Sequence, residues 1–314
     1  MTLLIQYTII FASVLLLVAL GGCFSERSGV INIGLEGIMV IGALGGALVM
    51  KFLPVSVGAP VMVLTVILAS AAAGLLYSLL LAVASITFRA DQTITGTAMN
   101  ILATAAATVA VKAMNTAASG GSDVSSEISY IQAKDAFIVR FGTFEFNWFM
   151  LVALIALVAA YIVLYKTRFG LRMRACGEHP QAADSVGINV YKMRYAGTLI
   201  SGALGGLGGI VFITAGVSVW KFELGVTGFG FLALAVMIFG AWHPVKIALA
   251  ALLFGFFRAL GNTYSGLSFM EALNLPSYVY NMLPYIVSLI VLALTSKKSR
   301  APKAEGIPYD KGQR

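Results

Sequence analysis

The stretch SGVINIGLEGIMVIGALGG, residues 28–46, is largely apolar, yet it contains the carboxylate of Glu36, the amide of Asn32 and six glycines. An acid is costly inside a membrane and glycine weakens a helix, so a plain lipid-facing span is not expected here. The two polar residues are four positions apart, which predicts one helical face that lines a water-filled path or meets a polar solute. Alternatively, Glu36 holds a broken helix by accepting hydrogen bonds from backbone amides freed around the glycines, or by pairing with Arg27.

The composition of the whole chain indicates its class. Of 314 residues, 59% are hydrophobic and 11% are charged, whereas soluble domains have about 25% charged residues. The expected fold class is therefore all-α, a polytopic transmembrane helical bundle that forms one domain over 1–296 and ends in a basic tail over 297–314. Apolar windows of about 20 residues predict about nine spans, near 3–22, 32–50, 61–86, 93–112, 147–165, 195–216, 226–241, 245–261 and 281–296.

Lysine and arginine in the loops predict the orientation, because positively charged loops stay in the cytoplasm. They gather in the 166–194 loop and in the tail, whereas the 113–146 loop has four acidic and two basic residues. The chain should therefore run from an outside N-terminus to a cytoplasmic C-terminus, with 113–146 extracytoplasmic. Residues 23–34 fit either a loop or a re-entrant turn. The net charge of +8 follows from this bias, so no nucleic-acid partner is implied.

Several kinds of chemistry lack the residues that they need. Cys23 and Cys176 are far apart and the chain has two histidines, which argues against a disulfide framework and against a metal site. No paired acids, activated nucleophile or phosphate-binding glycine loop is present, so neither an enzyme nor a bound nucleotide is expected. A secondary, ion-coupled solute transporter is the alternative function. It would need several charged residues within its spans, where only Glu36 and Arg258 are candidates.

The inner loop contains signals for a short helix. Pro180 suits a first helical position and Gly187 suits the position after the last, which predicts a helix over 180–186 between basic flanks. A short helix that is exposed on the cytoplasmic face and tethered at both ends is suited to docking into a groove of another protein. A solvated loop is the alternative interpretation.

Two distant segments resemble each other. Residues 29–40 and 225–236 share glycines and valines at matching positions, for example Gly34 with Gly230. In the expected topology the two copies enter the membrane from opposite sides, as in the inverted repeats of transporters, whose broken helices line the solute path. A chance match in a chain rich in glycine and valine explains the similarity equally well.

Small residues are frequent in the span that follows the inner loop. Gly202 and Gly206 are separated by three residues, as are Gly42 and Gly46 in the second span. In lipid, such faces let helix backbones approach closely. Close packing within the bundle or across a dimer is therefore expected.

Several blocks of the chain carry a family resemblance: SGVINIGLEGIM (28–39), ADQTITGTAMNILA (90–103), TRFGLRMRACGEHPQAADSVGINVYKMR (167–194), SGALGGLGGIV (201–211) and GFGFLALAVMIFGAWHPVKIALAALLFGF (228–256). In this order they resemble the permeases of ABC importers for ribose, branched-chain amino acids and nucleosides. The sequences of the first two blocks are most similar to those of the nucleoside-uptake subgroup.

The resemblance implies a subunit of the bacterial plasma membrane that moves nucleosides or a related simple sugar. It implies a second, related permease subunit, cytoplasmic ATPase subunits that bind the ATP, an extracytoplasmic lipoprotein that delivers the solute, and surrounding membrane lipid. The 166–194 loop would couple the permease to the ATPase. Its central residues would be Gly177, Glu178, Pro180, Ala182, Ala183, Asp184, Ser185, Val186 and Gly187. His179 stands where the family often has asparagine, and histidine is a weaker helix cap than asparagine.

A nucleoside has a flat base and ribose hydroxyl groups, so its path needs aromatic rings together with amide or hydroxyl partners. Two segments and the opening stretch offer such side chains, although each of them also serves in ordinary helix packing. The candidate solute-path residues are Asn32, Glu36, Thr95, Thr97, Asn100, Phe229 and Phe231.

Overall fold

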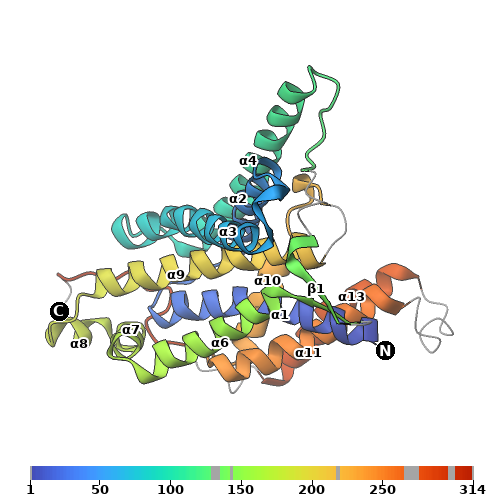
Figure 1. Ribbon diagram of the computed structural model, residues 1–314. Coiled ribbons are helices and arrows are strands. Elements are labelled where there is room, and N and C mark those ends of the chain that lie inside the picture. Colours follow the sequence, from blue (N-terminus) through green and yellow to red (C-terminus); the bar gives the residue numbers. More distant parts are fainter. Residues whose placement is uncertain are drawn as a thin grey trace.

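The computed structural model describes residues 2–128, 135–141, 144–216, 220–264, 276–295 and 301–312, whose regular secondary structure is helical apart from one hairpin (Figure 1). The longer helices are α1 (Thr2–Arg27), α2 (Leu35–Phe52), α3 (Ala59–Ala82), α4 (Gln92–Ala118), α6 (Trp148–Lys166), α9 (Val190–Val211), α11 (Pro244–Thr263) and α13 (Ser277–Thr295). The shorter ones are α7 (Arg168–Glu178), α8 (Pro180–Ser185) and α10 (Phe229–Phe239). Strands β1 (Ile138–Phe141) and β2 (Phe144–Asn147) pair antiparallel, and π turns extend α3 through Val83–Thr87 and α9 through Phe212–Gly216.

Seven of the described helices are long and apolar enough to cross a membrane: α1, α2, α3, α4, α6, α9 and α11. The all-α membrane bundle is thus confirmed, and each predicted window contains a helix. The window 226–241, however, contains only the 11 residues of α10. At 1.5 Å per residue this helix is about 16 Å long, roughly half of a ~30 Å hydrocarbon core. The apolar part of α13, at 278–290, is short as well.

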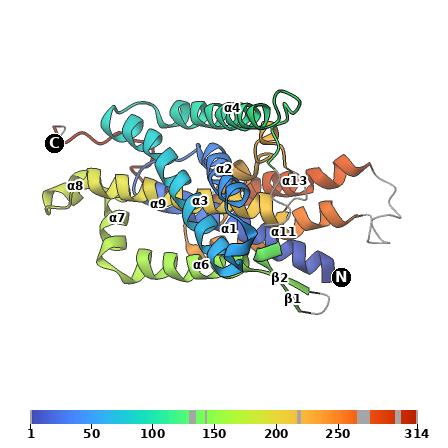
Figure 2. The ribbon, with the colours of Figure 1, turned by 45° about the horizontal axis from the view of Figure 1, so that its top comes forward.

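Helix α1 forms the centre of the bundle, where it packs against α9 and α11 and contacts α6 and α10 (Figure 2). Leu15, Leu17 and Leu20 of α1 are fully buried. In α1, 67% of the most apolar stretch of the helix is buried inside the bundle. In α6 the corresponding share is 28%. Helix α1 is therefore a core helix, whereas α6, which is equally apolar, lies at the periphery of the bundle, as a membrane span can.

Helices α2, α3 and α9 meet backbone to backbone. A Cβ at Gly206 in α9 would collide with the backbone of Ser70 in α3, and a Cβ at Gly42 in α2 would collide with Gly206. A Cβ at Gly202 would collide with Ser78. The close packing predicted from the spacing of the small residues is therefore confirmed within one chain.

The loop after α4 folds back on the end of that helix. The Asn115 side chain donates to the carbonyl oxygens of Ser125 and Glu127, at 3.0 and 2.7 Å, and accepts a hydrogen bond from Lys51 at 3.0 Å. One side-chain amide thus joins α2, α4 and the loop.

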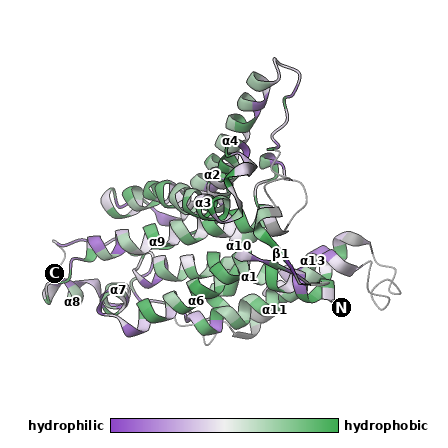
Figure 3. Ribbon diagram, viewed as in Figure 1, coloured by the Kyte–Doolittle hydropathy of each residue, from purple (hydrophilic) through white to green (hydrophobic). Residues whose placement is uncertain are grey.

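The two ends of the bundle carry different elements. The pair α7 and α8 lies at the same end as the described C-terminal residues, and the N-terminus and the hairpin lie at the other (Figure 1). The middle of the bundle is mainly hydrophobic, and hydrophilic residues gather near α7 and α8 and around the hairpin (Figure 3). The inner loop and the segment 301–312 therefore share one end, as the charge pattern predicts.

Candidate functional site

The chain between α1 and α2 makes a tight turn over residues 28–34. Asn32 is fully buried in this turn, and its Nδ2 donates to Ser201 Oγ of α9 at 2.8 Å. Helix α2 begins after Asn32, so Asn32 and Glu36 do not share a helical face, contrary to the prediction from their spacing. Asn32 fastens the turn to α9.

Glu36 lies in the first turn of α2 and reaches the N-terminus of α10. Its carboxylate oxygens accept hydrogen bonds from the backbone N–H groups of Gly228 and Gly230, at 2.8 and 2.7 Å. A carboxylate is favourable there, because the first amides of a helix have no partner within it. This matches the expectation of freed backbone amides, although these amides belong to α10. Arg27 is not the partner of Glu36, and it donates to the carbonyl oxygen of Trp242 at 3.1 and 3.2 Å.

Asn100 of α4 fixes the start of α2. Its Oδ1 accepts a hydrogen bond from the backbone N–H of Gly37 at 2.8 Å, and its Nδ2 donates to the carbonyl oxygen of Ile33 at 3.0 Å. A Cβ at Gly96 would collide with Gly34, so α4 passes close to the turn. The beginnings of α2 and α10 and the middle of α4 therefore meet at one place.

A cavity of about 660 Å³ opens at this meeting point. Four of the predicted solute-path residues line it together: Glu36, Thr97, Asn100 and Phe231. Its volume lies within the range of about 300–1,000 Å³ that is typical of ligand sites. The complete lining is Glu36, Thr97, Asn100, Ile101, Thr104, Ala105, Thr108, Val109, Glu223 and Phe231.

Three polar lining residues were missed by the sequence analysis. Thr104 and Thr108 continue the stripe begun by Thr97 along α4, and extending the helical period would have found them. Thr108 Oγ1 is buried and has no hydrogen-bond partner among the described residues. Glu223 comes from the turn after α9 and pairs with Lys112 at 3.2 Å, a contact for which the local sequence has no signal.

Three predicted solute-path residues lie elsewhere. Besides Asn32, these are Thr95, whose Oγ1 donates to the carbonyl oxygen of Asp91, and Phe229. Phe229 is fully buried, with its ring centroid 4.6 Å from that of Phe212 and the Arg258 guanidinium 5.3 Å from its own centroid. In this conformation these residues serve packing.

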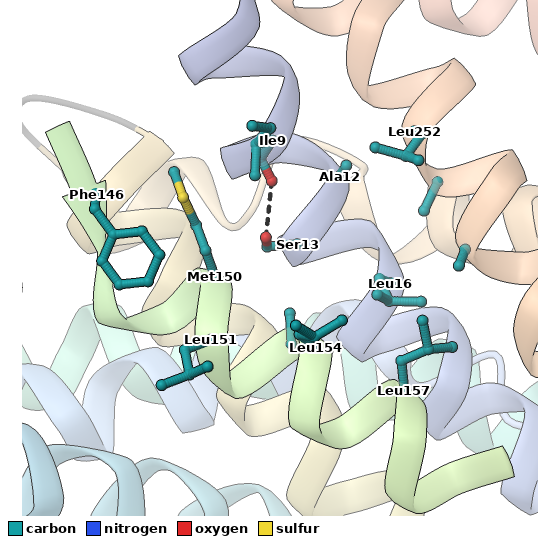
Figure 4. A pocket seen from close by; sticks show the side chains of 13 residues that line it. Ile9, Ala12, Ser13, Leu16, Phe146, Met150, Leu151, Leu154, Leu157 and Leu252 are labelled. Carbon is teal, nitrogen blue, oxygen red and sulfur yellow. Dashed lines mark hydrogen bonds between the residues drawn. The ribbon is translucent and has the colours of Figure 1, made fainter. Parts of the chain in front are cut away.

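A second cavity, of about 400 Å³, lies between α1, α6 and α11 and has an almost entirely apolar lining (Figure 4). The hydroxyl of Ser13 points toward its own helix and donates to the carbonyl oxygen of Ile9 at 2.7 Å (Figure 4). Because no polar group is left to orient a polar solute, this cavity is a poor candidate for the solute path.

The predicted inner helix is present as α8, which ends one residue before the predicted end. Pro180 begins it, the His179 side chain makes no capping hydrogen bond, and Gly187 follows it with φ of +84°. The candidate docking residues divide into two faces. Ala182, Ser185, Val186 and Gly187 are exposed, Glu178 and Asp184 are half-buried, and Gly177, Pro180 and Ala183 are buried.

The buried face of this segment packs on its own chain. Ala183 lies in a small cluster with Cys176, Val190 and Tyr309, so it does not face an outside partner, although it is one of the candidate docking residues. A Cβ at Gly177 would collide with the carbonyl group of the last residue of α1. Only the outer face of α8 is therefore free to meet another protein.

The end of α1 connects α7 to the turn between α10 and α11. Trp242 Nε1 donates to the buried carboxylate of Glu26 at 2.6 Å, while Arg27 binds the Trp242 carbonyl oxygen and lies 3.8 Å from Glu178 of α7. Ala241 and Trp242 have φ of +49° and +54°, which non-glycine residues rarely adopt. No sequence signal indicated this junction.

The chain matches the family model described as branched-chain amino acid transport system / permease component over residues 4–293. It is 42% identical to the guanosine ABC transporter permease protein NupQ of Bacillus subtilis (strain 168), over 100% of this chain and 98% of the relative. It is 38% identical to the nucleoside ABC transporter permease protein NupC of Lactococcus lactis subsp. cremoris (strain MG1363), over 97% of this chain and 96% of that relative. It is 30% identical to the putative glucose ABC transporter permease protein TsgC13 of Haloferax volcanii, over 87% of this chain and 81% of that relative. The comparison with solved structures finds no match.

Proposed function

The chain belongs to the family of permease components of the branched-chain amino acid transport system, and we propose that it is the permease subunit of an ATP-driven importer of nucleosides. Membership makes it a subunit of an ABC transporter that has no catalytic activity of its own, and it removes the secondary transporter as an alternative. The resemblance to the nucleoside-uptake subgroup is confirmed by relatives that match over nearly the whole chain. The names of these relatives support nucleosides as the solute.

The proposal that the solute is a nucleoside rests on the cavity beside Glu36. The Phe231 ring suits a flat base, while Asn100 and the unpartnered hydroxyl of Thr108 suit hydroxyl or amide groups. The carboxylate of Glu36 is already bonded to two backbone amides, so it does not demand a cationic solute. Neutral, partly aromatic solutes fit this mixture.

The proposal includes a second, related permease that completes the path. Helix α4, which forms one wall of the cavity, has the exposed apolar side chains Ile94, Ile101 and Val109, with exposed fractions of 71%, 70% and 67%. Such a face needs lipid or another membrane helix against it. The half-length α10 and its meeting with α2 support the broken helices of an inverted repeat.

The remaining partners follow from the two ends of the bundle. ATPase subunits, which bind ATP in this family, would dock on the outer face of α8 at the cytoplasmic end. The solute-binding lipoprotein would meet the opposite end, which carries the described start of α1 and the hairpin and would lie outside the bacterial plasma membrane.

The test is uptake of a labelled nucleoside by the complete importer in membrane vesicles, with unlabelled competitors. We expect competition by nucleosides and none by ribose or branched-chain amino acids. Thr108→Val should lower uptake about tenfold, because one hydrogen bond of ~1.4 kcal/mol is lost. Thr65→Val is the matched control, since the Thr65 hydroxyl bonds only its own helix. Competition by ribose alone would overturn the solute class.

A further inference from the structure

The segment 301–312, called the strap here, lies at the end of the bundle that carries α7 and α8 (Figures 1 and 2). It does not extend into solvent as a basic tail would. The backbone N–H of Ala304 donates to the carbonyl oxygen of Gly177 in α7 at 2.8 Å, and the carbonyl oxygen of Ile307 accepts from Arg194 Nη1 of α9 at 2.9 Å. The strap is thus bonded to both helices that flank α8.

The strap also packs under the docking helix. Tyr309 is 4% exposed and lies in the cluster that contains Ala183 of α8, Cys176 of α7 and Val190 of α9. Its ring centroid is 5.3 Å from that of Tyr191. The inner face of α8 therefore rests partly on the strap.

The opposite side of the strap touches the turn that leads to the solute cavity. Gly306 has φ of +77°, and a Cβ there would lie 2.7 Å from Ile31, within the 28–34 turn. Asp310 pairs with Arg89, before α4, at 2.9 and 3.1 Å. The strap thus contacts the segments that lead into α2 and α4, the helices that carry Glu36 and Asn100.

The buried charge of Arg194 shows that these contacts are part of the fold. The residue is 1% exposed, and its Nε and Nη2 have no hydrogen-bond partner among the described residues. The Ile307 carbonyl oxygen is the acceptor that the strap provides to this guanidinium. An uncompensated buried charge is strongly unfavourable, so the strap is held where it lies.

From these contacts we propose that the strap transmits movement of the docking helix α8 to the turn before Glu36, and so couples the ATPase to the solute cavity. This inference rests on the proposed docking role of α8. A packed element that borders both sites can carry coupling between them, and the strap shares a buried cluster with α8 on one side and lies against Ile31 of the 28–34 turn on the other. The outer face of α8 is not part of the strap contact.

The test uses the complete importer with Tyr309→Ala, which removes the strap's ring from the cluster that contains Ala183 of α8, or Gly306→Val, which disturbs the contact to the turn. Ile307→Ala is the matched control, because that side chain is 56% exposed. Permease amount, co-purifying ATPase, ATP hydrolysis and uptake are measured together. We expect the ATPase to stay bound and active, while uptake per permease falls about tenfold in both variants, equivalent to ~1.4 kcal/mol of coupling. The control should transport normally.

Three results would overturn the proposal. These are normal uptake in both variants, a loss of uptake that only follows a lower amount of permease, and a loss of the ATPase itself. Failure of the docking role is seen separately, in an Ala182→Arg variant that keeps the ATPase.

The position of the strap has a direct readout in Cys176. This thiol is buried in the cluster that contains Tyr309, and burial raises its pKa to about 11, so maleimide should react slowly. In a Cys23→Ser background, Tyr309→Ala should make Cys176 react faster and Ile307→Ala should not. Equal reactivity in the two variants would show that the strap does not cover the docking segment, which would also overturn the proposal.

Discussion

Glu36 joins two helices through charge. Its carboxylate bonds two amides at the start of α10, from the first turn of α2. Hydrogen bonds to an ionised group are stronger than neutral ones, and two of them fix both the position and the angle of α10. An apolar residue at this position would leave both amides without partners beside the cavity.

Glu36→Gln tests this role. Glutamine can present one acceptor oxygen, so its NH2 group would face one of the two helix amides. We expect a loss of about 1.5–3 kcal/mol of stability, seen as a lower unfolding midpoint in detergent, and reduced uptake.

The control for this change is Glu223→Gln, a carboxylate of the same cavity with a half-exposed partner. It should leave the unfolding midpoint nearly unchanged. If both variants lose stability equally, the cavity needs negative charge as such, and capping of α10 is not the reason.

At the scale of elements, α10 is held at both ends by the chain around the α1–α2 turn. Glu36 caps its N-terminus, and Glu26 and Arg27 hold the following turn through the side chain and the carbonyl group of Trp242. Because Arg27 also lies near Glu178, the end of α7 is connected to the same turn. A shift of α7 would therefore be transmitted to the turn that follows α10.

An arginine placed on either face of α8 should have a different effect. Ala182→Arg adds charge to an exposed face, so the permease should insert in normal amounts and lose the ATPase. Ala183→Arg forces a guanidinium into the cluster with Cys176 and Tyr309, which should cost a few kcal/mol and lower the amount of permease. Quantifying the permease and the co-purifying ATPase separates the two effects. Normal ATPase binding by Ala182→Arg would move the docking site away from α8.

At the scale of the whole molecule, the ends of the bundle predict accessibility from opposite sides of the membrane. Ser122→Cys, in the loop after α4, and Ser185→Cys, in α8, are matched substitutions at exposed serines. An impermeant maleimide applied to intact cells that express the permease without its ATPase, which would otherwise cover Ser185, should label the first, and the second only after the membrane is opened. Labelling in the reverse order would show that the chain is inserted the other way round.

Properties that depend on local composition were predictable from the sequence. Windows of about 20 apolar residues predict membrane helices because transfer into lipid depends on the segment itself. Helix signals are local as well, so Pro180 and Gly187 marked the start and the end of α8. The spacing of Gly202 and Gly206 likewise predicted a close helix contact. The window 226–241 overestimated the length of α10, because the turn residues on either side of the helix are also apolar and were counted with it.

The partners of polar groups were decided only by the tertiary structure. Glu36 bonds amides 192 and 194 residues away, and the resemblance between 29–40 and 225–236 pointed to the region without indicating this contact. Likewise, the sequence alone determined that α8 forms, while the burial of Ala183 depends on Tyr309, far along the chain. Hydropathy and helix signals are properties of neighbouring residues, whereas a hydrogen bond or a buried face depends on which distant segment packs against it.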